Sequence, residues 1–232
     1  MKLLGLIGGM SWESTALYYR GLNEAVKRRL GGYHSANLIL YSVDFAAIER
    51  HQRSGNWDAA GECLAGVARL LEEAGAQAIV LCTNTMHCVA PRIETEVHIP
   101  LLHIIDATAT SINSAGLSTV GLLGTRFTME QAFYKDRLTE RFGIRVVIPK
   151  AESREIIHRI IYEELVFGKV LPRSRTAYRR VIDDLVSRGA AGIVLGCTEI
   201  AMLIRPTDVT VPLFDTTHLH VEHAAAWTID AV

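Results

Sequence analysis

An internal repeat limits the folds that this chain can adopt. The segment GAQAIVLCT at residues 75–83 returns 114 residues later as GAAGIVLGC at residues 189–197, with five of nine positions identical. Two further pairs occur in the same order at nearly the same offset: GLIG at 5–8 with GLLG at 121–124, and IPLL at 99–102 with VPLF at 211–214. A constant offset between several similar segments is typical of a duplicated architecture. We therefore expect two halves built on one plan.

The repeated segments indicate parallel strands. They are apolar and β-branched, as strands buried on both faces of a sheet are, and one more apolar run in each half, at 37–41 and 144–148, brings the count to four strands per half. Helical patterns alternate with them at residues 14–30, 58–74, 128–142, 155–167 and 174–188. This alternation predicts an α/β fold with two pseudo-symmetric lobes. Each lobe is expected to be a short, mostly parallel four-stranded sheet flanked by helices, with the active site between the lobes.

The lobes are expected to be discontinuous in sequence. We place the first lobe at about residues 1–98 plus 210–232 and the second at about residues 99–209. A last helix, at about residues 217–232, is expected to pack back on the first lobe. Since no linker rich in Pro, Gly or Ser separates the halves, the lobes should be closely packed.

Composition excludes several classes of protein. The net charge of −1, from 24 basic and 25 acidic residues, favours neither nucleic acid nor a membrane surface as a partner. The apolar stretch at the N-terminus is too short for a signal peptide or a membrane span, which predicts a cytoplasmic protein. Four cysteines without zinc-type spacing are expected to be reduced thiols. No residue set suggests a metal or another cofactor.

Polar residues follow the two best-matching strands. Thr83 begins TNT in the first half, and Cys197 begins CTE at the equivalent place in the second. A buried strand that runs into a helix start delivers such side chains to one edge of a parallel sheet. We expect the helix start to lower the pKa of the Cys197 thiol and favour thiolate. Two such edges suit a reaction that needs groups on opposite sides of one carbon.

The remaining candidates have simpler interpretations. Cys63, Cys82 and Cys88 are expected to be packing residues, and His87 a buried histidine engaged in hydrogen bonds. The glycines of GGMSWEST at residues 8–15 fit a tight strand-to-helix turn. The alternative is that this turn lets the backbone approach a small anionic ligand.

Three motifs together resemble the aspartate/glutamate racemase family. They are GGMSWEST at 8–15, LCTNTMH at 81–87 and LGCTE at 195–199, and the likeness runs over essentially the whole chain. The resemblance implies a pyridoxal-independent racemase in which each lobe presents one residue to the substrate α-carbon. Members usually carry two cysteines there. Thr83 in place of one of them is similar to the subgroup of L-aspartate/glutamate-specific racemases.

The resemblance also implies roles for individual residues. Thr83 and Cys197 would be catalytic, and the substrate would be bound by Met10, Gln52, Asn84, Thr85, Thr198 and Glu199. It implies a small acidic amino acid as substrate, a homodimer, and no metal or cofactor. Several aspartate racemases carry a lysine near the position of Val166, where this chain has none. The choice between aspartate and glutamate therefore stays open.

The expected mechanism is a two-sided proton transfer. The Cys197 thiolate removes the α-proton from the L-enantiomer, and Thr83 supplies a proton from the other side, alone or through a water. A threonine hydroxyl is a poor resting base, so turnover from the L-enantiomer should be favoured while the equilibrium constant stays near one. Two alternatives remain: a single-cysteine decarboxylase or isomerase of small dicarboxylates, and a non-catalytic ligand-binding module with an inert thiol.

Overall fold

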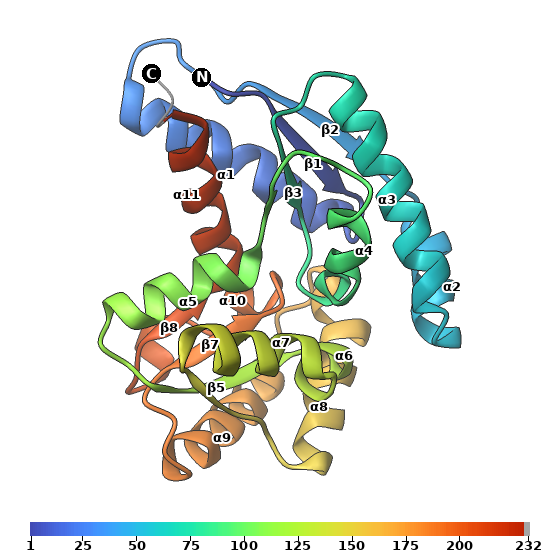
Figure 1. Ribbon diagram of the computed structural model, residues 1–232. Helices are drawn as coiled ribbons and strands as arrows, with labels where there is room; N and C mark the ends of the chain where they lie inside the picture. Colours follow the sequence, from blue (N-terminus) through green and yellow to red (C-terminus); the bar gives the residue numbers. More distant parts are fainter. Residues whose placement is uncertain (230–232) are drawn as a thin grey trace. The chain divides into compact units, whose positions relative to one another are not determined.

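The computed structural model describes residues 1–229 and contains two α/β units (Figure 1). The first unit comprises Met1–Ile104 and the segment that begins at His220, and the second comprises Ile105–Leu219. Within residues 1–229, each helix is too short or too polar to cross a membrane.

The first unit contains four strands and the helices that cover them. Its elements are β1 (Leu4–Gly8), α1 (Trp12–Leu30), β2 (Leu38–Ser42), α2 (Phe45–Ser54), α3 (Trp57–Glu73), β3 (Ala78–Leu81), the 3₁₀ helix η1 (Thr85–Val89), α4 (Ala90–Glu94), β4 (Leu101–Leu102) and most of α11 (Thr216–Ile229).

The second unit repeats this plan with more helical segments. Its elements are α5 (Ile104–Ser114), β5 (Thr119–Gly124), α6 (Arg126–Glu130), α7 (Ala132–Asp136), the π-helical turn η2 (Arg137–Arg141), β6 (Arg145–Val147), α8 (Ala151–Glu163), η3 (Leu165–Phe167), α9 (Pro172–Ser187), β7 (Ile193–Gly196), α10 (Ile200–Leu203), η4 (Pro206–Asp208) and β8 (Leu213–Asp215).

The two sheets share one topology. Their strand orders are β2-β1-β3-β4 and β6-β5-β7-β8, and every pairing is parallel. The central pairs correspond residue by residue, because Ile7 aligns with Leu81 in one sheet and Leu123 with Leu195 in the other. The expected pair of four-stranded parallel sheets is confirmed.

The boundaries between the units differ from those expected. The chain passes from the first unit to the second after residue 104 rather than after residue 98. It returns to the first unit after residue 219 rather than after residue 209. The reason is backbone pairing: β4 bonds to β3 and so belongs to the first sheet, and β8 bonds to β7 and so belongs to the second. The helix α11 begins after β8 and continues into the first unit, where the last helix was expected to pack. Residues 230–232 of that expected helix lie outside the described part.

The cores follow from the alternation of side chains along each strand. In the first sheet, Leu4 and Leu6 pack with α1 and α11, whereas Ile7 packs with α2, α3 and α4 on the other face. In the second sheet, Leu123 and Leu195 pack with α8, α9 and α10. On both sheets this leaves the carboxyl ends of the strands as the place where polar side chains follow a buried segment.

One predicted helix is broken. The pattern over residues 128–142 forms α6, α7 and η2 instead of one helix, and Gln131 between the first two is extended, with φ −69° and ψ 150°. The sequence also left α2, α4 and α5 unassigned. The other predicted helices are present, with ends shifted by a few residues.

Two equivalent glycines generate a stability prediction. A Cβ on Gly5 would lie 2.9 Å from the Ala76 Cβ and 3.0 Å from the Leu71 Cβ, and one on Gly121 would meet the side chain of Leu185, the counterpart of Leu71. We expect Gly5→Ala to lower the free energy of unfolding by about 1–3 kcal/mol, because these neighbours are fixed in the core. The measurement is urea unfolding.

The matched control is Gly66→Ala on α3. A Cβ there meets nothing within 4 Å, so the variant should be stabilised by up to about 1 kcal/mol through helix propensity. Equal midpoints for Gly5→Ala and the unmodified protein would contradict the close packing of α3 on β1.

Candidate functional site

The first unit places a polar segment directly after β3. Thr83, Asn84 and Thr85 are all buried there. Met10 follows β1, which is the parallel neighbour of β3, so Met10 and Thr83 lie at the same edge of the sheet. Five of the predicted site residues thus belong to this unit: Met10, Gln52, Thr83, Asn84 and Thr85.

Gln52 reaches this edge from α2. Its amide nitrogen donates to the sulfur of Met86 at 3.0 Å, and Met86 shares one core cluster with Met10. The Gln52 Oε1 atom is buried and has no hydrogen-bond partner among residues 1–229. A buried polar atom without a partner is costly, so this amide is available to a bound group.

The glycine turn after β1 is a packing feature. The Gly9 amide donates to the Thr15 hydroxyl at 2.7 Å, and that hydroxyl donates to the Ser11 carbonyl at 2.8 Å. A Cβ on Gly8 would stand 2.3 Å from the Thr15 methyl carbon, and Gly9 has φ of +94°. Both positions therefore require glycine to bring the strand end against α1, in agreement with the interpretation as a tight turn.

The second unit places a thiol beside a carboxylate. Cys197 follows β7 and is half-buried, and Thr198 and Glu199 are buried beside it. The Cys197 thiol donates a hydrogen bond to the Glu199 Oε2 atom at 2.9 Å. All three second-half residues predicted from the sequence thus lie together at the end of β7.

The thiol does not have the lowered pKa that we expected. Burial raises the pKa of the Cys197 thiol well above its usual range, and the negative charge of Glu199 raises it further. The helix that follows, α10, has only four residues, and Glu199 stands directly before it. The expectation of a helix-stabilised thiolate is therefore wrong: at rest the proton stays on the sulfur, facing an acceptor.

Two threonines at this edge were missed in the sequence. The Thr217 hydroxyl donates to the Thr198 hydroxyl at 3.0 Å, and the Thr216 hydroxyl donates to the Leu195 carbonyl at 2.8 Å. Both follow β8, the parallel neighbour of β7. The signal was present, because the polar run Asp215-Thr216-Thr217 follows the repeat segment VPLF, as TNT and CTE follow the other two strands.

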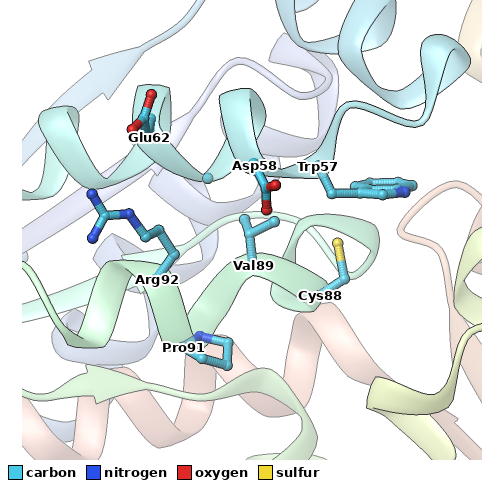
Figure 2. A pocket seen from close by; sticks show the side chains of 8 residues that line it. Trp57, Asp58, Glu62, Cys88, Val89, Pro91 and Arg92 are labelled. Atoms are coloured by element: carbon cyan, nitrogen blue, oxygen red, sulfur yellow. The ribbon is translucent and has the colours of Figure 1, made fainter.

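A cavity elsewhere in the first unit is lined by different residues. It measures about 520 Å³ and lies between α3 and the η1–α4 segment (Figure 2). Its lining residues are Trp57, Asp58, Gly61, Glu62, Cys88, Val89, Pro91 and Arg92, and none of the predicted site residues is among them.

The chemistry of this cavity is unlike that of the strand ends. The Arg92 guanidinium pairs with Glu96 at 2.6 Å. Burial raises the pKa of the Cys88 thiol to about 12, so this cysteine stays protonated at neutral pH and is a poor nucleophile. The predicted assignment of Cys88 to packing rather than chemistry agrees with this.

The fold and the strand-end residues define a class of protein: a duplicated α/β enzyme with a cysteine at the end of a central parallel strand. The chain belongs to the Asp/Glu/hydantoin racemase family, whose model matches residues 7–224. It is therefore an isomerase of the racemase class, as the resemblance of its motifs implied.

Known proteins agree with this assignment. The chain is 21% identical over 227 residues to the broad specificity amino-acid racemase RacX of Bacillus subtilis (strain 168), with 92% of each chain covered. A putative Asp/Glu racemase from Yersinia pestis is 55% identical with a TM-score of 0.94, covering 99% of this chain and all of the other. An aspartate racemase homologue from Pyrococcus horikoshii OT3 is 37% identical with a TM-score of 0.86, covering 98% and 99%.

The thiol–carboxylate pair generates a testable prediction. Because the raised pKa keeps Cys197 protonated, iodoacetamide at about pH 8 should alkylate it more slowly than exposed Cys63 in the same protein. Glu199→Gln removes the opposing charge, so the thiol pKa should fall and the alkylation of Cys197 relative to Cys63 should increase. Peptide mass spectrometry measures both sites at once.

The control variant is Glu94→Gln, which removes an exposed carboxylate on α4 and should leave the ratio unchanged. Equal labelling ratios in Glu199→Gln and the unmodified protein would mean that Glu199 does not control this thiol.

Proposed function

We propose that this racemase interconverts the L- and D-enantiomers of aspartate and glutamate without pyridoxal phosphate, by two-sided proton transfer at the α-carbon. The observation that carries the proposal is the thiol–carboxylate pair of Cys197 and Glu199 at the end of β7. Thr83, at the repeat-equivalent end of β3, supplies the second group. The mechanism requires these two side chains to face opposite sides of one α-carbon.

Glu199 gives the thiol a route to thiolate. The carboxylate already accepts the thiol hydrogen bond, so the proton can move from sulfur to oxygen over a single contact. The thiolate then takes the α-proton of the L-substrate and becomes a thiol again, and Glu199 releases the proton that it accepted to solvent. Since burial raises the thiol pKa, the thiolate formed in this way is a strong base, which suits the removal of a weakly acidic C–H proton.

Thr83 is suited to giving a proton rather than taking one. Its hydroxyl makes no hydrogen bond to any of the described residues, and Thr85 stands where the other half has Glu199. The first half therefore has no carboxylate at the place where the second half has its acceptor. The Thr83 hydroxyl, directly or through a water, protonates the carbanion from the second side and regains its proton from solvent.

The other predicted residues are assigned to binding. Asn84, Thr85 and Thr198 would hold the α-carboxylate and the ammonium group, because they are buried donors and acceptors next to the two proton-transfer groups. Gln52 would line the side-chain end of the substrate, with its amide turned so that the nitrogen donates to the distal carboxylate, and Met10 would lie near the α-carboxylate and the ammonium group.

The asymmetry of the site has a defined kinetic form. The enantiomers have equal free energy, so the equilibrium constant is one and kcat/KM must be equal in the two directions. A poor base on the Thr83 side must therefore appear as a lower kcat from the D-enantiomer, accompanied by a lower KM.

The decisive experiment follows proton exchange and inversion together. The protein is incubated with pure L-aspartate or L-glutamate in D₂O, with EDTA and without pyridoxal phosphate. Chiral chromatography with mass spectrometry then reads the D-enantiomer and the deuterium at the α-carbon. Formation of deuterated D-product supports the proposal, and a wider panel of L-amino acids tests its substrate range. If neither exchange nor inversion occurs with either acidic amino acid, the proposal is overturned.

Cys197→Ser tests the base. A serine hydroxyl is not ionised near neutrality, so both exchange and inversion from the L-enantiomer should fall by about 10²- to 10⁴-fold. Cys63→Ser, at an exposed position on α3, is the control and should retain the activity of the unmodified protein. Substantial racemisation by Cys197→Ser would remove Cys197 from the mechanism.

Thr83→Ala tests the donor. It should slow L-to-D inversion by about 10²- to 10⁴-fold, while Cys197 still exchanges the α-proton of the L-substrate with solvent. Thr83→Cys should restore an ionisable group on this side and raise kcat from the D-enantiomer more than kcat from the L-enantiomer.

A threonine that only binds the carboxylate gives a different pattern. In that case exchange and inversion fall together in Thr83→Ala, and Thr83→Cys brings no gain from the D-enantiomer. Initial rates from each pure enantiomer in D₂O separate the two roles.

A further inference from the structure

Three histidines are buried together in the first unit. His87, His103 and His220 are 1%, 5% and 0% exposed, and the His87 ring centroid lies 4.5 Å from that of His103 and 5.9 Å from that of His220. The expectation that His87 is a buried, hydrogen-bonded histidine is confirmed. Its two ring nitrogens have partners that assign it a more particular role.

Two hydrogen bonds of the His87 ring involve backbone atoms. The Nδ1 atom lies 2.6 Å from the carbonyl oxygen of Thr83, and the backbone amide of Ile104 donates to the Nε2 atom at 3.2 Å. A carbonyl can only accept and an amide N–H can only donate. Together, the two bonds therefore require the neutral ring with its proton on Nδ1.

These two partners lie at functionally distinct places. Thr83 carries the hydroxyl to which the proposed function assigns the second proton, and Ile104 is the residue after which the chain crosses into the second unit. The single ring of His87 therefore fixes the backbone of the donor residue to the crossing segment.

His220 makes a parallel connection that does not include Thr83. Its Nε2 atom donates to the Leu102 carbonyl at 2.7 Å, and its Nδ1 atom accepts from the Tyr18 hydroxyl at 2.8 Å. His220 begins the return of the chain into the first unit. It matches His87 in burial and in having two such ring bonds, but neither of these two bonds reaches Thr83.

The His87 ring has no counterpart in the second half. Ala201 occupies the repeat-equivalent position, and the Cys197 carbonyl accepts instead from the backbone amide of Ile200 at 3.1 Å. The Cys197 carbonyl is thus held by a backbone amide one turn further on, whereas the Thr83 carbonyl is held by the side chain of His87. The ring is thus a feature of the donor half alone.

We propose that His87 is a positioning residue that sets the direction of the Thr83 hydroxyl by holding the Thr83 carbonyl. This inference rests on the proposed function of Thr83. Losing the ring bond would let the backbone of Thr83 rotate, which misdirects the donor but leaves Cys197 and Glu199 unchanged. Inversion should then suffer while proton exchange on the L-side continues.

Two amide substitutions separate the two ring bonds. In His87→Asn the amide nitrogen can occupy the Nδ1 position and keep the bond to Thr83, but the acceptor for Ile104 is lost. In His87→Gln the longer side chain places its amide oxygen near the Nε2 position and keeps the bond to Ile104, but the bond to Thr83 is lost. Both variants remove the same ring from the same core.

The readout is the ratio of inversion to exchange, measured in D₂O from the L-enantiomer. We expect His87→Gln to lower this ratio by roughly three- to tenfold, the equivalent of one hydrogen bond, and His87→Asn to stay within about twofold of the unmodified protein. His220→Asn is the control for a lost buried histidine: it should lower the urea midpoint without changing the ratio. An unchanged ratio in His87→Gln, or an equal fall in both His87 variants, overturns the proposal.

A second measurement needs no activity. Long-range ¹⁵N–¹H spectra of histidine-labelled protein should show His87 as the neutral Nδ1–H form, with its signals identified by their loss in His87→Asn. A His87 ring protonated on Nε2 overturns the proposal, whatever rates the variants show. If the unmodified protein neither exchanges the α-proton nor inverts the L-enantiomer, the proposed function is rejected. The spectra would still decide the geometry of the His87 ring.

Discussion

The chemistry of this protein depends on a constraint of buried parallel sheets. Strands packed by helices on both faces have no room for unpaired polar side chains along their length, so such groups gather where the strands end. Thr83 follows β3, Cys197 follows β7 and Thr217 follows β8 shortly after its end. Burial of these strands in the cores therefore also confines the reactive groups to the carboxyl edges of the sheets.

Much of this arrangement could be predicted because it depends on local patterns. Apolar runs at a constant offset predict equivalent strands, and polar residues directly after them predict the edge where Thr83 and Cys197 lie. The break at Gln131 could not be predicted, because neither Pro nor Gly marks it in the sequence. The unit boundaries were misplaced for a similar reason: strand pairing, which sequence similarity alone does not report, assigns β4 and β8 to their sheets.

The pKa of the Cys197 thiol is raised rather than lowered because the thiol is buried and the Glu199 side chain points toward it. The sequence shows Glu199 two residues after the cysteine, but the spacing does not say whether the carboxylate turns toward the sulfur or away from it. The structure turns it toward the sulfur at 2.9 Å, and a charge at that distance outweighs the partial charge at the start of a four-residue helix. The two repeat segments end in similar ways but differ at a few equivalent positions: Thr85 corresponds to Glu199, and His87 corresponds to Ala201.

The path of the chain also affects the order in which the protein can be completed during synthesis. The second unit is one continuous segment, whereas the first receives Val221, Ala224 and Ala225 of α11 into the core beside Tyr18 and Leu22. The backbone of Thr228 closes on Lys2 at 2.9 Å. A ribosome therefore releases everything that the second unit needs before it releases the residues that cover α1. The half that carries Thr83 is synthesised first and finished last.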